Sequence, residues 1–539
     1  MKKLMSSKWL LLFVVALSMV LVLAACATDE EPAPVPDDDD EVVVGEPRRG
    51  GDLVIALDWE PDPVIDVYNL GWGNLPHDLF EGLLISDYDF NPGPGIAESF
   101  RFEEDGLVQI YEIRQDRYFH DGTKINAEAV KRHFELLTDE EVDSMSRWDF
   151  AFISSMEVLD EYTLQVNLDN PFPAALSNFS WSGGWGGLQN PWAWEEYGPW
   201  GENTYGTEVV VGSGPFKFVE WIPGDRLVME RFEDYRSTPI HENEGPAYLD
   251  SVTYRFIFDS STAVMEFEVG NVHILETVPP EFVEQVRNMP GANVYEGTGW
   301  EVVYVGMACD KPPFDDVRVR QALNLAVNQE EIAEIVWMGY AEPAYGYISP
   351  LFGDSYVGDK ETFGYDPEKA KELLAEAGYA DGFTTEIMVE PRTDWIAAAE
   401  IIQDMLAEIG VTAEIRQYER AGYYDKLRAE EQEMFIRAHS WWGLDILPWY
   451  FHSRNFPYPN YHRYVNEEMD ARFDAADYAD TYEELVEGYR AIQVDLNREA
   501  LWIPLVNTLD IVAYRDEVQN FTFHPHYGIR YNVDVWLDE

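Results

Sequence analysis

Residues 383–418 read FTTEIMVEPRTDWIAAAEIIQDMLAEIGVTAEIRQY, and this stretch decides the predicted fold class. Residues 383–389 and 411–418 are predicted strands, and residues 394–409 form a predicted helix between them. A strand, a helix and a second strand in this order make a βαβ unit, in which the two strands run parallel and the crossover is right-handed. We therefore expect an α/β protein.

Helix start and stop signals predict further helices before this unit. Asp366 provides an N-cap, Pro367 occupies the first helical position and Gly378 ends the same helix. Two more helices are expected after Asp315 and Asn328. From about residue 275 onward, helices and strands therefore alternate.

Strand signals dominate the chain up to about residue 270. Residues 162–168 alternate between polar and apolar side chains, which predicts a half-buried strand. Residues 216–221 and 226–231 flank a Pro-Gly turn and predict a hairpin. A helix capped by Asn126 lies between these strands. These patterns predict two α/β lobes, with the last ~30 residues again strand-like.

The charge of the chain excludes nucleic acid as a partner. The chain has 539 residues, with 101 Asp plus Glu against 37 Lys plus Arg, and its formal net charge is −64. Such an excess of negative charge repels phosphate backbones. Hydrophobic residues make up 46% of the chain, which indicates a folded body beneath a solvated acidic surface. The length suggests about three structural units.

The N-terminus has the features of a targeting segment. Three lysines precede residues 9–25, which are apolar except for one serine. This stretch is shorter than the ~20 residues of a spanning helix and ends in small residues, as a signal peptide does. Its end, LAAC at residues 23–26, resembles a bacterial lipoprotein cleavage box. We therefore expect a signal peptide over residues 1–25 and a lipidated Cys26, with an uncleaved signal anchor as the alternative.

The next segment and the cysteine count agree with an anchored extracytoplasmic protein. Residues 26–47 contain several prolines and a run of four aspartates, so we expect an extended tether. Cys309 is the other cysteine of the sequence, so a lipidated Cys26 leaves no disulfide and no CxxC site. Histidines are scattered, and a proline separates the nearest pair, His524 and His526. Metal-complex binding is therefore a lesser alternative, and no cofactor is predicted.

Nine blocks occur in a shared order along the mature chain. They are GGDLVIA at 50–56, LFEGLL at 79–84, GIAESF at 95–100, EDGL at 104–107, FHDGT at 119–123, NAEAVK at 126–131, VGSGPFKF at 211–218, WIPGDR at 221–226 and PFDDVRVRQAL at 313–323. In these blocks the chain resembles the extracellular solute-binding proteins of the peptide/nickel family, the ligand-capturing subunits of ATP-driven importers. The order of the blocks behind a lipoprotein signal makes the resemblance specific.

The resemblance implies a two-lobed α/β clamp of the periplasmic-binding-protein type, class II, with an extra N-terminal subdomain. Lobe I with this subdomain is expected over residues 48–274 and lobe II over residues 275–505, and residues 506–539 return to complete lobe I. The chain would cross between lobes near residues 273–279 and 503–511. Proteins of this type close on their ligand by a hinge motion.

The resemblance also implies partners and a location. An ABC permease and its ATPase subunits would receive the ligand. The protein would be extracytoplasmic and held on the cell membrane by the lipid on Cys26, in the periplasm or at the outer face of the membrane. No catalytic residue is expected.

A candidate site for a peptide's α-ammonium comes from the Trp-x-x-Asp motif of the peptide-binding branch. WGLD at residues 442–445 matches it, so Asp445 and Trp442 are candidate ligand-binding residues, together with the preceding Trp441. A carboxylate in a water-excluded cleft attracts an ammonium more strongly than in bulk water, and an indole face adds cation–π contact. The family usually continues with an acid before proline, whereas this chain continues as ILP at 446–448.

Arg392 is the candidate partner for a peptide's carboxylate. It lies on the loop between a predicted strand and a predicted helix, near where some dipeptide-binding relatives place their arginine, although the two positions differ by a few residues. The alternative is an ordinary loop arginine paired with one of the surrounding acids.

Aromatic residues make up 14% of the chain and keep a second ligand class open. Tryptophans gather in two places, at positions 181, 185, 192, 194 and 200 and at positions 441, 442 and 449. Aromatic faces can hold apolar peptide side chains or stack on sugar rings, and they can also simply pack a loop onto the protein. Because sugars carry no formal charge, an aromatic cleft with few cations is compatible with an oligosaccharide.

Together these observations predict a lipid-anchored substrate-binding subunit of an ABC importer that captures oligopeptides by hinge closure. An oligosaccharide-binding protein of the same fold is the alternative. A secreted glycan-acting enzyme with a tryptophan-lined cleft is a lesser one, and the ordered family blocks count against it.

The anchor is testable by substitution. Cys26→Ser removes the thiol that would carry the lipid, so we expect the protein to leave the membrane fraction and to appear in the periplasm or medium. Fractionation followed by immunoblotting measures this change. Continued membrane retention with an intact N-terminus would support the uncleaved signal anchor.

Overall fold

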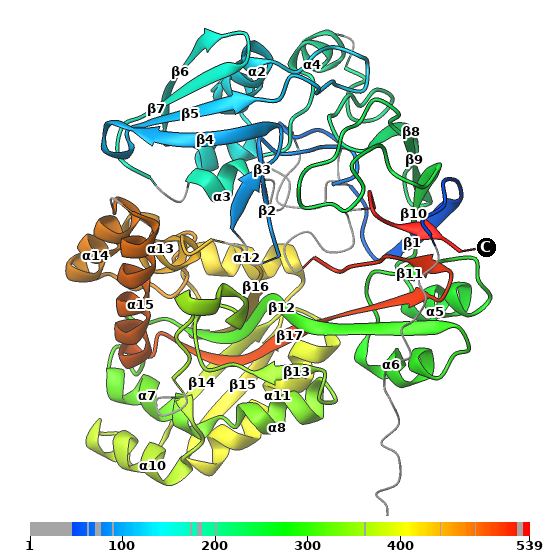
Figure 1. Ribbon diagram of the computed structural model, residues 1–539. Coiled ribbons are helices and arrows are strands. Elements are labelled where there is room, and N and C mark those ends of the chain that lie inside the picture. Colours follow the sequence, from blue (N-terminus) through cyan, green and yellow to red (C-terminus); the bar gives the residue numbers. More distant parts are fainter. Residues whose placement is uncertain are drawn as a thin grey trace, which may run out of the picture. The chain divides into compact units, whose positions relative to one another are not determined.

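The computed structural model describes residues 46–538, except 62–63, 70–76, 89–90, 173–174, 181–185, 200, 202, 360–362, 442, 480 and 525–531 (Figure 1). The predicted signal peptide, Cys26 and nearly all of the predicted tether lie outside the described residues. Within the described part of the chain, no helix combines the length and the apolar character that crossing a membrane requires.

A mixed sheet of 11 strands is the backbone of the fold. Its order is β15-β14-β16-β12-β17-β11-β1-β10-β9-β8, and β13 pairs with β17 at its side (Figure 1). The bounds are β1 Asp52–Leu57, β8 Phe216–Ile222, β9 Arg226–Arg231, β10 Ser251–Phe256, β11 Ile274–Leu275, β12 Ala292–Met307, β13 Ala341–Pro343, β14 Phe383–Val389, β15 Val411–Gln417, β16 Met434–His439 and β17 Trp502–Arg515.

Lobe I is defined here by two hydrophobic clusters, which combine residues 53–289 with residues 511–537. β1 runs parallel to both β10 and β11, and β9 pairs antiparallel with β10. The remaining elements of this part are α4 Pro191–Tyr197, α5 Ser260–Glu268, α6 Pro280–Arg287, β18 Val518–Gln519 and β19 Trp536–Leu537. The C-terminal residues therefore share a core with the first half of the chain.

A four-stranded antiparallel sheet forms a subdomain of lobe I, in the order β4-β5-β7-β6. In β7 the alternating pattern buries Leu164, Val166 and Leu168, and α2 packs against β6 and β7. The elements are β2 Leu84–Ser86, β3 Pro92–Pro94, β4 Ala97–Glu103, η1 Glu104–Gly106, β5 Val108–Ile113, α2 Ala127–Thr138, η2 Met145–Phe150, β6 Ile153–Asp160, β7 Thr163–Leu168 and α3 Ala175–Phe179.

Lobe II packs into two further clusters, built from residues 303–506, and contains the predicted βαβ unit. β14 and β15 are parallel, with Phe383 opposite Val411, and α11 packs against both strands. The elements are α7 Val317–Ala326, α8 Gln329–Val336, η3 Pro350–Ser355, α10 Pro367–Glu376, α11 Thr393–Glu408, α12 Arg420–Arg428, α13 Ile446–Phe451, η4 Ser453–Asn455, α14 Glu467–Asp477 and α15 Tyr482–Glu499.

The long strands β12 and β17 connect the two lobes and pair antiparallel along most of their length (Figure 1). Their register shifts between Thr298 and Val302, where three residues of β12 oppose one residue of β17. Glycine is required in this bulge, because a Cβ on Gly299 would lie 2.9 Å from the carbonyl oxygen of Thr508. The bulge therefore interrupts the regular ladder at the passage between the lobes.

The packing of α6 bears on the predicted crossing points. The sequence suggested a first crossing near residues 273–279, but Val283 and Val286 of α6 pack in a lobe I cluster. We therefore propose that the chain crosses within β12 at residues 298–302 and returns within β17 at residues 507–509. On this proposal, lobe I extends about twenty residues further than the sequence suggested.

Most local predictions are confirmed by the structure. Asn126 and Asp366 cap their helices by accepting hydrogen bonds from backbone N–H groups, and Gly378 has a φ of +94° beyond the end of α10. One cap differs, because the side chain that caps α7 belongs to Asp316 and not to Asp315. β10 ends at residue 256, and Phe258 beyond it is 56% exposed.

A buried ion pair connects two segments of lobe I, one just before β2 and one just after β5. Arg117 donates two hydrogen bonds to Glu81, at 3.0 and 3.1 Å, and the two side chains are 3% and 1% exposed. Burial raises the pKa of Glu81, and the nearby guanidinium of Arg117 lowers it. Removing one partner leaves the other charge buried without compensation.

Glu81→Gln is therefore expected to lower the free energy of unfolding by ~3–5 kcal/mol, measured by urea denaturation. Glu368→Gln is a matched control, because Glu368 is paired with Lys371 but is 80% exposed, and it should cost less than ~1 kcal/mol. Equal stabilities of the two variants would contradict the assigned role of the buried pair.

Candidate ligand-binding cavity

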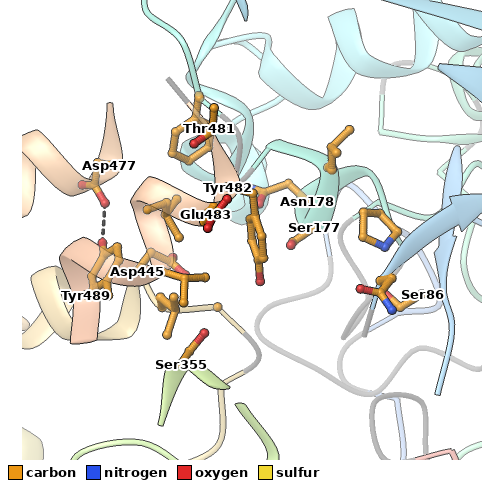
Figure 2. Close-up of a pocket in the computed structure, with 18 of the residues that line it drawn as sticks. Ser86, Ser177, Asn178, Ser355, Asp445, Asp477, Thr481, Tyr482, Glu483 and Tyr489 are labelled. Carbon is orange, nitrogen blue, oxygen red and sulfur yellow. Dashed lines mark hydrogen bonds between the residues drawn. The ribbon is translucent and has the colours of Figure 1, made fainter. Parts of the chain in front are cut away.

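A cavity of about 1120 Å³ lies between the subdomain of lobe I and the helices of lobe II. Lobe I contributes residues of β2, η1, η2 and α3, and lobe II contributes residues of β12, η3, α15 and the segment that precedes α13. Figure 2 shows Asp445 and Ser355 on the lobe II side of this cavity, and Ser177 and Asn178 on the lobe I side. Its volume exceeds the ~300–1,000 Å³ of pockets for drug-sized ligands.

The end of β16 places Asp445 at the cavity. The chain leaves the sheet after His439, and Asp445 immediately precedes α13. Its side chain makes no capping bond to the helix and instead accepts a hydrogen bond of 3.1 Å from Nε1 of Trp441. A Cβ on Gly443 would lie 2.0 Å from the carboxylate, so glycine at this position leaves room for Asp445.

Asp445 is exposed at the surface of the cavity, and neighbouring protein groups perturb its carboxylate. The pKa of Asp445 is raised to about 6, because loss of hydration and the charge of Asp477 outweigh the lowering effect of the bond from Trp441. Asp477 accepts a hydrogen bond from Tyr489 and lies 3.6 Å from Arg454 (Figure 2). Asp445 therefore has one side-chain donor within the described part of the protein.

Asp149 of η2 contributes a second carboxylate, from the opposite lobe. Burial and, less strongly, the charge of Asp445 raise the pKa of Asp149 to about 7. Like charges disfavour ionisation, so the charge of Asp445 makes ionisation of Asp149 less favourable. Sequence patterns did not indicate Asp149, because no motif links residue 149 to residue 445.

The other predicted ligand-binding residues are placed differently. Trp441 lines the cavity, is 7% exposed and stacks on Trp449 at 6.1 Å, whereas Trp442 lies outside the described residues. Arg392 is not among the residues that line the cavity. It pairs with Asp394 at 2.7 Å and lies over Trp395 at 4.3 Å. The structure thus brings Asp445 and Trp441 together without Arg392.

The tryptophan-rich stretch around residue 190 does not supply the aromatic lining in the described part of the chain. Trp194 is buried and donates to Asp66 at 2.8 Å, so it packs its segment onto lobe I. Trp192 is 39% exposed and does not line the cavity. Positions 181, 185 and 200 lie outside the described residues. The aromatic side chains that do line the cavity are those of Phe102, Phe150, Phe172, Trp300, Phe352, Trp441, Tyr482 and Tyr489.

Two residues of the EDGL block, Glu104 and Gly106, line the cavity on the lobe I side. The sequence connected this block to the family resemblance and not to a ligand site. The described residues contain no group of three or more His, Cys, Asp or Glu arranged to hold a metal ion. The lining therefore combines carboxylates, aromatic faces and small polar groups.

Known proteins share both the sequence pattern and the fold. Residues 91–462, more than half of the chain, match the model of bacterial extracellular solute-binding proteins, family 5 Middle. The glutathione-binding protein GsiB of Salmonella typhimurium is 27% identical over 469 residues, which cover 84% of this chain and 88% of that protein.

Two solved structures illustrate the fold. The periplasmic binding protein DppA of Helicobacter pylori, in complex with the peptide STSA, superposes with a TM-score of 0.75 at 24% identity and covers 91% of this chain and 99% of that one. The oligopeptide-binding protein AppA of Bacillus subtilis, in complex with a nonapeptide, gives a TM-score of 0.73 at 22% identity and covers 92% and 100%. The chain therefore belongs to the family 5 bacterial extracellular solute-binding proteins and has their two-lobed α/β fold.

Proposed function

We propose that this protein is the lipid-anchored, substrate-binding subunit of an ABC importer, and that it captures oligopeptides in the cavity between its lobes. The observation that carries the proposal is the carboxylate of Asp445, which opens onto that cavity with Trp441 beside it. The glutathione-binding relative and the two solved peptide complexes support a peptide-like ligand.

Asp445 would hold the α-ammonium of the peptide. In surroundings of intermediate polarity, an ion pair is about four times stronger than in bulk water at the same separation. Oδ1 already accepts the bond from Trp441, so Oδ2 would accept the main hydrogen bond from the ammonium. The indole of Trp441 keeps the carboxylate in position, which reduces the ordering cost of binding.

The rest of the lining suits the remaining parts of a peptide. Ser177, Asn178 and Ser355 can exchange hydrogen bonds with main-chain amides. Aromatic faces such as those of Phe172 and Trp300 can pack against side chains of varied shape. The polar groups would hold the peptide backbone in place, and the apolar walls would accept side chains of different sequences.

An oligosaccharide is the second candidate ligand, and the aromatic lining is the observation that favours it. Sugar rings stack on aromatic faces and need no formal charge in the site. Asp445 would then act as a hydrogen-bond acceptor for a hydroxyl group. We propose no catalytic step for either ligand.

Capture would be completed by closure of the lobes. β12 and β17 join the lobes, and the bulge at residues 298–302 is where we expect the bend, because packed cores resist continuous deformation. The closed form would deliver its ligand to the permease, with the ATPase subunits supplying the energy. Lipidated Cys26 would hold the protein on the outer side of the cell membrane.

Closure can be measured in solution. Small-angle scattering should give a smaller radius of gyration in the presence of a bound peptide, because the lobes approach while each core stays intact. The same peptide added to Asp445→Asn, at a concentration that does not saturate this variant, should leave the radius nearly unchanged. An unchanged radius of the saturated wild-type protein would contradict closure.

Asp445→Asn tests the ligand class. Asparagine keeps the shape of the side chain and removes its charge, so peptide affinity should fall by about 2–5 kcal/mol, or roughly 30-fold to several thousand-fold. Acetylating the peptide's α-amino group should weaken binding to the wild-type protein by a similar factor, and the two changes should not add fully, since both delete one interaction.

Asp354→Asn is the matched control, because Asp354 is an exposed acid in the wall of the same cavity and its loss changes the net charge equally. Calorimetric titration provides the affinities. If free and N-acetylated peptides bind the wild-type protein equally well, Asp445 does not hold the ammonium. A sugar ligand would tolerate asparagine with little loss.

A further inference from the structure

Seven carboxylates line the cavity, and the described lining contains no Lys, Arg or His. The acids are Glu103, Glu104, Asp149, Asp354, Asp445, Asp477 and Glu483. They make up seven of 32 lining residues, a proportion close to the 101 of 539 in the whole chain, so their number alone says little about the ligand. The way in which the acids are partnered is more informative.

The acids that are buried in lobe I are compensated by groups of the protein itself. Glu81 has its two-pronged bond from Arg117, and Asp66 accepts several hydrogen bonds, one of them from Trp194 at 2.8 Å. Asp78 accepts from a tyrosine hydroxyl at 2.8 Å. Such pairing is expected, because a charge that is taken out of water without a partner is costly.

Asp149 differs from these three acids. It is half-buried, and among the described residues the one hydrogen bond to its carboxylate comes from its own backbone N–H. Asp445, which faces it from the other lobe, has the indole of Trp441 and its own backbone as donors. Neither carboxylate has a cationic partner among the described residues, and both line the cavity. A cationic ligand in the cavity can therefore pair with both of them.

We infer that the cavity selects cationic peptides, whose α-ammonium lies at Asp445 of lobe II while a basic side chain near the peptide's N-terminus lies at Asp149 of lobe I. This inference rests on the proposed function and adds the charge of the ligand to it. It assigns Asp149 as a specificity-determining residue.

The placement of the two acids on opposite lobes links ligand charge to closure. Without a ligand, closure brings two like charges together, and their repulsion opposes it. A ligand with two positive groups replaces this repulsion by two ion pairs, so it binds the closed form more tightly than the open form. Differential affinity of this kind is what shifts the population toward closure.

Neighbouring aromatic side chains agree with a basic ligand. Phe150 follows Asp149 in the cavity wall, and Phe172 and Tyr482 line the same cavity. Lysine and arginine side chains place their charged ends over aromatic faces and pack their methylene groups against them. Peptides with a net negative charge, glutathione among them, would meet uncompensated acids and are expected to bind weakly.

Matched tripeptides separate this inference from the proposed function. Alanyl-lysyl-alanine, its glutamine counterpart and its glutamate counterpart differ in one side-chain charge and share the same α-ammonium. For the detergent-solubilised full-length protein, calorimetry should show the lysine peptide binding about tenfold more tightly than the glutamine peptide, with the glutamate peptide weakest of the three.

Asp149→Asn should bring the lysine and glutamine peptides to within about threefold of each other and leave the glutamine peptide's affinity nearly unchanged. Asp445→Asn should instead weaken all three peptides. Glu104→Gln is the matched control, because it removes one exposed acid from the lobe I wall of the same cavity and should keep the lysine preference.

Each outcome decides between the two proposals. Equal binding of the three peptides to the wild-type protein overturns the charge selection and leaves the peptide-binding function standing. A lysine preference that survives Asp149→Asn overturns the role of Asp149. Absence of binding by every peptide, or equally tight binding of the dication putrescine, overturns the peptide-binding function itself.

Discussion

The antiparallel pairing of β12 with β17 is the constraint on which the rest of the structure depends. These strands carry the main chain between the lobes, and their hydrogen bonds join both halves into one sheet. The C-terminal residues can share the core of lobe I only because β17 returns there. The bulge at Gly299 interrupts this ladder, and this is where we propose that the connection between the lobes bends.

Acidic residues are common throughout this chain, so their number does not identify the binding site. The hydrogen-bond and ion-pair partners of each carboxylate say more about it. Within lobe I the buried acids have donors from the protein, as the pair of Glu81 and Arg117 shows. Asp149 and Asp445 have no cationic partner among the described residues and line the same cavity. Their place in the wall of one cavity makes both acids available to a cationic ligand.

Relatives with this fold carry names for different ligands, so the fold alone does not identify the substrate. In this chain the ligand class depends on side chains that line one cavity. Asp445 would bind a terminal ammonium, Asp149 would bind a basic side chain, and the aromatic wall would pack against apolar groups. The described lining is acidic and contains no Lys, Arg or His. A cavity that binds an anionic ligand would need such cationic side chains.

The sequence by itself determined the local elements, because caps, turns and alternation depend on neighbouring residues. The βαβ unit at residues 383–417, the cap at Asn126 and the hairpin of β8 and β9 are where the patterns predicted them. The Trp-x-x-Asp motif of the sequence also pointed to Asp445, which lines the cavity. Only the tertiary structure placed Asp149 opposite Asp445 and directed Arg392 to Asp394 instead of the cavity. These placements depend on how the two lobes pack, and contacts between residues about 300 positions apart leave no periodic signal in the sequence.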